Sequence, residues 1–242
     1  MIQNLSATLA RLSAALLLLM AAAVPAAAAE NVLVFGGSGR LGAEVVKALT
    51  AAGHQVTVFA RPTSKLDRVA ESNVAVVEGD VMNEADVEAA FKSAKFTAAV
   101  DALARGDADV AFYEASMRHI AKWAAATGVK QVILHGSVGA GDSQTIYPKS
   151  RWEAMKPTLM AKDAGEKALM ASGVGYTIIR NAVLRDLAPG ATDAAALTDD
   201  QSKFGAVTRT GLGRLTAECL GKAACANKIF HAIDPGVAIP GG

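Results

Sequence analysis

The stretch NVLVFGGSGRLG, residues 31–42, sets a short apolar run directly before a glycine-rich turn. The run from Asn31 to Phe35 predicts a buried β-strand, because β-branched and other apolar residues fill it without interruption. The following apolar positions recur at the spacing of one helical face, and they are Leu41, Val45, Ala48, Leu49 and Ala52. The stretch therefore predicts a strand, a tight turn and an amphipathic helix in immediate succession.

The glycines of the turn fit G-x-G-x-x-G from Gly37 and also G-x-x-G-x-x-G from Gly36. Glycine lets such a turn tighten and lets the backbone approach a pyrophosphate closely. The helix that follows presents unpaired N–H groups and a positive dipole end to the phosphates. A bare tight turn is the alternative, but the strand before the glycines and the helix after them favour dinucleotide binding.

Along the rest of the chain, apolar runs alternate with helical patterns. Strands are expected at residues 55–60, 74–77, 98–103, 131–135, 176–180 and 228–233, and helices from about 83, over 110–124, 161–171 and 210–220. The stretches 138–148 and 186–203 read as loops. This alternation predicts an α/β fold, a Rossmann-type doubly wound parallel sheet forming a single domain over residues 30–242.

The second expected strand ends without the Asp or Glu that usually holds the ribose 2′-hydroxyl of NAD. The residues there are Ala60, Arg61, Pro62, Thr63, Ser64 and Lys65. Arg61 would face a 2′-phosphate with its guanidinium group, and Ser64, Lys65 or Arg40 would add a contact. These cations would otherwise be solvated surface residues. The pattern favours NADP(H) as cofactor, with NAD(H) second.

The first residues have the layout of a secretory signal peptide. Arg11 is the only cation before an apolar run over residues 12–24, and Pro25 and four alanines precede Glu30. This order predicts cleavage near Ala29, a signal peptide over residues 1–29, and a periplasmic or secreted protein with no remaining membrane anchor. An uncleaved anchor is the alternative. Cys219 and Cys225 would either pair in an oxidising compartment or remain as two thiols.

Composition narrows the range of partners. Lys and Arg number 24 against 23 Asp and Glu, so no strongly basic surface for nucleic acid is indicated. The four histidines show no metal-ligand spacing, and no metal site is predicted. The expected partner is a small-molecule substrate, and the oligomeric state is left open.

Several segments in order resemble the atypical short-chain dehydrogenase/reductases, in particular their NmrA-like NAD(P)-binding branch. The segments are Gly36 to Gly42, residues 59–61, Gly79 with Asp80, residues 128–130, residues 135–137, Lys162 with Glu166, and residues 172–180. After the glycine loop, the stretch KDAGEKALMASGVGYTIIR, residues 162–180, carries the most specific likeness.

The resemblance implies roles for particular positions. The glycine loop and the end of the second expected strand supply the expected cofactor contacts Gly36, Gly37, Ser38, Gly39, Arg40, Leu41, Gly42, Arg61 and Lys65, and the resemblance adds Asp80, Val81, Ala102 and Leu103. Asp80 and Val81 would contact the adenine, and Ala102 and Leu103 would line the middle of the cofactor. Ser137 would lie beside the nicotinamide, Lys162 would bind its ribose, and the loop from Asn181 would close over cofactor and substrate.

The chain departs from the Tyr-x-x-x-Lys pair that most short-chain dehydrogenases use for proton transfer. Thr158 stands four residues before Lys162, and Tyr147 is followed four residues later by Arg151. The catalytic candidates are therefore Ser137, Lys162 and, as a proton donor from the loop, Tyr147.

Two functions fit these residues. One is an NADP(H)-dependent oxidoreductase acting on a small carbonyl, enone or quinone-like acceptor, and the other is a non-catalytic NAD(P)-binding redox sensor or partner-binding protein. Whether the protein is an enzyme stays open at this point. Export adds a conflict, because nicotinamide dinucleotides are cytosolic.

Overall fold

The structure, a computed structural model, describes residues 29–105 and 111–239. The predicted signal peptide, residues 1–29, lies outside the described residues except for Ala29. At the centre is an eight-stranded sheet with the strand order β3-β2-β1-β4-β5-β6-β10-β8. Its strands are β1 (Asn31–Phe35), β2 (Gln55–Ala60), β3 (Ala75–Glu78), β4 (Ala98–Asp101), β5 (Gln131–Ser137), β6 (Tyr176–Asn181), β8 (Ala196–Thr198) and β10 (Lys228–Ile233).

The pairings are parallel from β3 to β10, and β8 joins β10 in the antiparallel sense. Strands β1, β2 and β3 succeed one another outward, and the chain then returns across β1 to form β4. This reversal opens a crevice at the carboxyl ends of β1 and β4, where doubly wound sheets bind ligands. The single-domain Rossmann-type prediction is confirmed.

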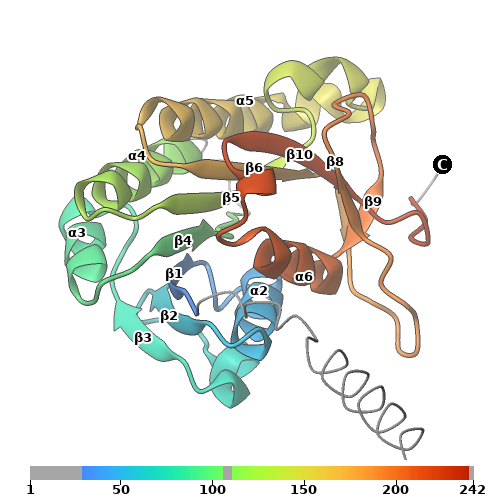
Figure 1. The fold of residues 1–242 in the computed structure, drawn as a ribbon. Helices are drawn as coiled ribbons and strands as arrows, with labels where there is room; N and C mark the ends of the chain where they lie inside the picture. The colour runs from blue at the N-terminus through green and yellow to red at the C-terminus, as the bar shows by residue number, and fades with distance from the viewer. Residues whose placement is uncertain (1–28, 106–110, 240–242) are drawn as a thin grey trace, which may run out of the picture.

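Helices cover both faces of the sheet (Figure 1). On one face lie α2 (Arg40–Ala51) and α6 (Arg209–Cys219), which pack against each other and share one apolar core with the strands. On the other face lie α3 (Glu84–Lys92), α4 (Ala111–Ala126) and α5 (Lys149–Ala171), over a second core. The long apolar strands are buried on both sides, as parallel strands between two helical layers must be.

Two differences from the sequence prediction have physical reasons. Strand β4 ends at Asp101 instead of residue 103, because the Asp101 carboxylate accepts a hydrogen bond from the Leu103 amide at 2.8 Å and turns the chain. Helix α5 begins at Lys149, twelve residues before the predicted start at 161, and contains Pro157. The first half of α5 is mostly exposed and polar, so it has no apolar stripe from which a helix could be predicted.

A small parallel pair was also missed. Strands β7 (Val183–Arg185) and β9 (Ala206–Thr208) pair beside the main sheet, and each is only three residues long. Runs this short show no alternation from which to predict a strand. The pair holds the loop after β6 against the start of α6, and both segments contribute residues to the cavity described below.

Cys219 and Cys225 form a disulfide that ties the end of α6 to the short helix η3 (Ala223–Cys225). Of the two alternatives that the sequence left open for these cysteines, the structure has the paired one. In the two described ranges, none of the helices combines the length and the apolar character needed to cross a membrane.

Candidate functional site

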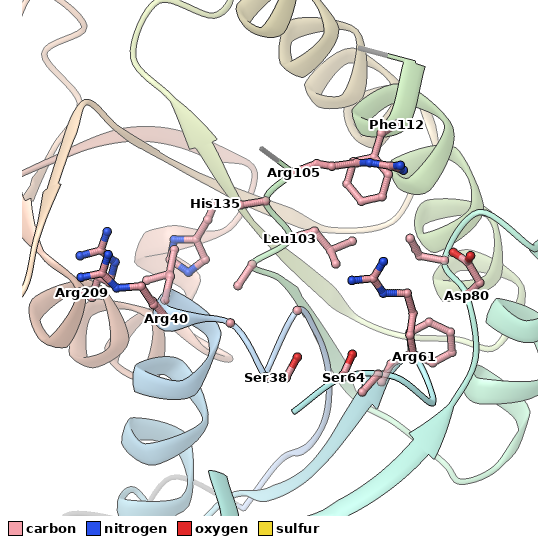
Figure 2. A pocket seen from close by; sticks show the side chains of 18 of the residues that line it. Ser38, Arg40, Arg61, Ser64, Asp80, Leu103, Arg105, Phe112, His135 and Arg209 are labelled. Atoms are coloured by element: carbon pink, nitrogen blue, oxygen red, sulfur yellow. The ribbon is translucent and has the colours of Figure 1, made fainter. Parts of the chain in front are cut away.

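A cavity of about 540 Å³ opens at the carboxyl ends of the central strands (Figure 2). Its walls come from the loops after β1 to β4, from residues of β5, β6, β7, α4 and α5, and from the first turns of α2 and α6. The lining residues are Gly36, Ser38, Gly39, Arg40, Leu41, Phe59, Ala60, Arg61, Ser64, Gly79, Asp80, Val81, Ala102, Leu103, Ala104, Arg105, Phe112, His135, Lys162, Asn181, Leu184 and Arg209. The cavity is elongated from the β2 side to the α6 side, and each region has its own chemistry.

The glycine loop forms the floor of the cavity. Gly36 has φ +78, and a Cβ there would lie 2.8 Å from the Ala102 carbonyl group, so only glycine suits this position. At Gly37 a Cβ would lie 2.9 Å from Val58, and at Gly42 it would overlap the backbone of Gly36. Gly37 and Gly42 thus shape the loop from behind, while Gly36, Ser38 and Gly39 line the cavity.

The first turn of α2 is open to an anion. Gly39 is the N-cap, and no side chain caps the helix. No acidic residue stands in the first turn either. The N–H groups that begin a helix have no partner within it, and they attract phosphate when no side chain satisfies them. This loop therefore fits the pyrophosphate of a dinucleotide.

The β2 side of the cavity carries the predicted adenosine contacts. Arg61 and Ser64 both line it, and the Ser64 amide donates to the Arg61 carbonyl at 2.8 Å, which holds the two residues in one turn. Asp80 and Val81 line the wall after β3. Lys65 is not one of the described residues that line the cavity. The cation facing this region is Arg61, and Figure 2 shows its side chain directed toward the cavity.

The inner end of the cavity gathers buried polar groups from β4, β5, α5 and β6. The Lys162 ammonium lies 4.8 Å from the centre of the Tyr113 ring. Burial lowers the pKa of Lys162, and Asp101 and Glu166 oppose that shift. Burial raises the pKa of Asp101 to about 6, against the Leu103 amide and Lys162. A carboxyl and an ammonium whose pKa values are moved toward each other are typical of a functional site.

His135 lines the same region as a neutral side chain. Its Nε2 lies 3.0 Å from the Thr216 hydroxyl, which donates its single proton to the Leu212 carbonyl. With the hydroxyl donating to that carbonyl, the contact fits the tautomer that carries its proton on Nε2. Burial, with the charge of Lys162, lowers the pKa of His135 to about 4, and Nδ1 has no hydrogen-bond partner among the described residues.

Behind this region a buried ion pair fixes the ends of β5, β6 and α5. Arg180 donates to Glu166 from Nη2 at 2.8 Å, and both side chains are almost fully buried. Arg180 also binds Asp142 and Gln201 through Nη1. A Cβ at Gly136 would overlap the Glu166 carboxylate, so the pair packs directly on the β5 backbone. Nothing in the apolar β6 run predicts a buried partner for Arg180.

The three catalytic candidates are not brought together. Lys162 lines the cavity, whereas Ser137 and Tyr147 are not among the described residues that line it. Ser137 ends β5 opposite Asn181 of β6. The Tyr147 ring packs with Trp152 and Phe204, at centroid distances of 6.2 and 6.0 Å. The catalytic roles of Ser137 and Tyr147 stay predictions without support from this geometry.

The α6 side of the cavity holds two arginines. Arg40 and Arg209 line it, and both bind the carboxylate of Asp186. The sequence predicts a contact of Arg40 with the same phosphate as Arg61, but the structure turns Arg40 toward α6 instead (Figure 2). Arg105, Phe112 and Arg209 also line the cavity without having been predicted. Their positions depend on long-range packing that no local motif encodes.

Comparison with known proteins agrees with this architecture. The sequence profile of a family described as NAD(P)H-binding matches residues 36–223. No curated protein matches the sequence. The solved structure of ChuY, an anaerobillin reductase from Escherichia coli O157:H7, superposes with a TM-score of 0.76 at 23% identity, covering 86% of this chain and 99% of that one.

Two further solved structures have the same fold and contain cofactors. A short-chain dehydrogenase/reductase from Veillonella parvula DSM 2008 in complex with NADP gives a TM-score of 0.67 at 18% identity, covering 86% of this chain and 95% of that one. The enzyme WbmG from Bordetella bronchiseptica in complex with NAD gives 0.65 at 19% identity, covering 86% and 74%. At these identities the likeness establishes the shared fold.

Proposed function

The chain belongs to the NAD(P)H-binding family, and on that premise we propose that it is an NADP(H)-dependent oxidoreductase that reduces a small carbonyl, enone or quinone-like acceptor. One observation carries the choice of cofactor. The strand that normally ends in an acid for the NAD ribose is followed here by Arg61, which lines the cavity beside Ser64. A guanidinium in this position suits a 2′-phosphate and has no matching partner in NAD.

In this proposal the residues of the cavity divide the work of binding. The uncapped first turn of α2 holds the pyrophosphate, and Gly36 brings the backbone close enough to do so. Arg61 and Ser64 bind the 2′-phosphate, and Asp80 with Val81 faces the adenine. Lys162 binds the ribose next to the nicotinamide. The roles of the other predicted contacts, among them Lys65, remain predictions from the sequence.

A bound dihydronicotinamide supplies the hydride, so the protein has to orient the acceptor and provide a proton. Lys162 is the one predicted catalytic residue that lines the cavity. We assign it the proton: its Nζ donates to the acceptor oxygen as the acceptor carbon receives the hydride, so that a carbonyl becomes an alcohol. Burial lowers the pKa of Lys162, so its ammonium gives up a proton more easily. The negative charge of Asp101 opposes this shift and favours the protonated lysine that the donation requires.

ChuY and the Veillonella protein support the reductase reading by fold and by their described activity or cofactor. The alternative is a redox sensor that binds the dinucleotide without turnover. The absence of a tyrosine four residues before Lys162 favours that alternative, because Thr158 is a poor acid.

Turnover separates the two. The protein is mixed with NADPH and a panel of quinones, enones and aldehydes under anaerobic conditions, and NADPH absorbance is followed. Reductase activity with one class of acceptor, lost in Lys162→Gln but kept in Lys156→Gln on the same helix, supports the enzyme. Tight NADPH binding with no oxidation across the panel supports the sensor.

We also propose that the chain is exported and cleaved after Ala29. The sequence pattern of residues 1–29 supports this, and so does the Cys219–Cys225 disulfide, because such bonds persist in oxidising compartments. Mass spectrometry of the protein from the producing cell tests it. A mature N-terminus at Glu30 is expected, and an intact N-terminus in the cytosolic fraction contradicts it.

A further inference from the structure

The α6 side of the cavity contains a small, well-defined charge cluster. Arg40 is the first residue of α2, Arg209 is the first residue of α6, and both line the cavity. Asp186 lies between them, and each of its carboxylate oxygens takes one guanidinium. Arg209 Nη1 donates to Oδ1 at 2.7 Å, and Arg40 Nη2 donates to Oδ2. We call Arg40 and Arg209 the arginine pair.

Packed elements fix the spacing of the arginine pair. The register of β7 with β9 ends at Arg185 opposite Thr208, so Asp186 and Arg209 follow directly from paired residues. The Thr208 hydroxyl accepts from the Gly211 amide at 2.9 Å and caps α6.

Helix α6 is held beside α2 by two contacts. The Thr210 hydroxyl donates to the Glu44 carboxylate at 3.0 Å, and Gly213 packs so closely on the Glu44 backbone that a Cβ would lie 2.5 Å from its carbonyl oxygen. The two helix starts, and the arginines on them, are therefore set side by side by the fold.

The carboxylate that now joins the pair is weakly held. The side chains of Asp186 and Arg40 are 61% and 59% exposed, whereas that of Arg209 is only 14% exposed. Exposed ion pairs contribute little because water screens them. A carboxylate that reaches Arg209 from inside the cavity would be less exposed to water than Asp186 is. It would therefore bind the guanidinium more strongly, and displacing Asp186 would cost little free energy.

We propose that the arginine pair binds a carboxylate group of the acceptor, and that Asp186 occupies its position when no acceptor is present. The inference rests on the proposed reductase function and names its substrate class: anionic acceptors that carry a carboxylate. Asp186 already displays the required geometry, with one oxygen on each guanidinium.

The phosphates of the dinucleotide are the competing source of negative charge. The proposed function gives them other partners: the uncapped N–H groups of the first turn of α2 for the pyrophosphate, and Arg61, on the opposite side of the cavity, for the 2′-phosphate. Arg209 instead shares its part of the lining with Leu184 and Asn181, on the segment that follows β6. The same cavity continues from there to Lys162, so a carboxylate at the pair leaves the rest of the acceptor inside.

Calorimetry with a matched acid and amide tests the inference without turnover. Phenylacetate and phenylacetamide are titrated into the protein with and without saturating NADP⁺. We expect phenylacetate to bind at least about tenfold more tightly than the amide, which lacks the charge. Arg209→Gln should weaken phenylacetate binding about tenfold or more. Asp186→Asn should strengthen it several-fold, because the internal competitor has lost its charge.

Arg185→Gln is the matched control, since Arg185 is an exposed neighbour of Asp186 and is not one of the described residues that line the cavity. It should leave both affinities unchanged, and circular dichroism confirms that each variant is folded. Equal binding of acid and amide, or Asp186→Asn and Arg209→Gln variants that behave like the wild-type protein, would overturn the inference and leave only a structural ion pair.

NADPH binding is measured in parallel to keep the two proposals apart. If Arg209→Gln weakens NADPH and not phenylacetate, the pair serves the cofactor and the inference fails. If the wild-type protein binds no NADPH, the proposed function fails, whatever the phenylacetate titration shows.

Discussion

The ammonium group of Lys162 lies 4.8 Å from the centre of the Tyr113 ring, at the inner end of the cavity. The Tyr113 hydroxyl is bonded to the backbone of Arg105, accepting from its N–H at 3.1 Å and donating to its carbonyl at 3.2 Å. The ring is thereby fixed at its far edge, and a cation over a fixed aromatic face has a defined position. Lys162 thus has a defined position, although Thr158 and not a tyrosine stands four residues before it.

Replacing Lys162 with Gln should remove most of the activity while sparing most of the cofactor affinity. Loss of a positioned proton donor costs about 10²-fold or more in kcat. NADPH binding should weaken by less than about tenfold, because one ribose contact among many is lost. The measurement is steady-state kinetics with a responsive acceptor together with NADPH titration. A Lys162→Gln enzyme with unchanged kcat would remove Lys162 from the mechanism.

Gly36 and Gly53 offer a comparison of two glycines with similar backbones. Their φ values are +78 and +85, but a Cβ at Gly36 would meet the Ala102 backbone at 2.8 Å, whereas nothing lies within 4 Å at Gly53. Gly53→Ala should cost about 1 kcal/mol of unfolding free energy from φ alone. Gly36→Ala should cost at least about 2 kcal/mol, because the β1 and β4 loops must separate, and it should also abolish NADPH binding.

Chemical denaturation of both variants checks this pair of expectations. Equal losses of unfolding free energy for the two substitutions would mean that the glycine loop has room for a side chain. The close approach of Gly36 to Ala102 would then not explain why a glycine is needed there.

Asp101 and His135 should make opposite contributions to stability between about pH 4 and pH 6. The pKa of Asp101 is raised to about 6 in the folded protein, so the native state binds more protons there and its contribution falls as pH rises. The pKa of His135 is lowered to about 4, so the unfolded state binds more protons and that contribution rises with pH. In the wild-type protein the two nearly cancel.

Single substitutions should expose each slope. Relative to the wild-type protein, Asp101→Asn should gain up to about 1.4 kcal/mol of stability per pH unit as pH rises through this window. His135→Asn should show the opposite difference, losing stability as pH rises. Urea unfolding at several pH values measures both slopes, and the comparison cancels other titrating groups. Parallel curves for all three proteins would contradict the burial of these charges.

The sequence predicted the parts of the fold that local patterns encode. β1, the glycine loop and α2 followed from an apolar run, glycine spacing and one helical face, and the cavity does run over this loop. The pairing of β7 with β9, the ion pair of Arg180 with Glu166, and the meeting of Arg40 with Arg209 depend on residues far apart in sequence. Local patterns carry no signal for such contacts.

The catalytic assignment shows the same limit. Lys162 was found through its likeness to a family motif, and the structure places it in the cavity. Tyr147 was chosen only because a hydroxyl was needed nearby, and its ring packs on Trp152 and Phe204 instead. The contact of His135 with Thr216 joins residues 81 apart in sequence, and no local pattern predicts it.

The assignment of NADP(H) to this cavity is tested most directly by a fluorescence titration of the protein with NADPH and with NADH, repeated with Arg61→Ala. We expect micromolar or tighter NADPH binding, weaker NADH binding, and an Arg61→Ala variant that loses about tenfold or more in NADPH affinity while its NADH affinity is unchanged. Arg68→Ala, an exposed arginine of the nearby helix η1 (Asp67–Ser72), serves as the control. Absence of saturable binding for both dinucleotides would contradict the proposed function, and equal affinities that ignore Arg61 would contradict the assignment of NADP(H).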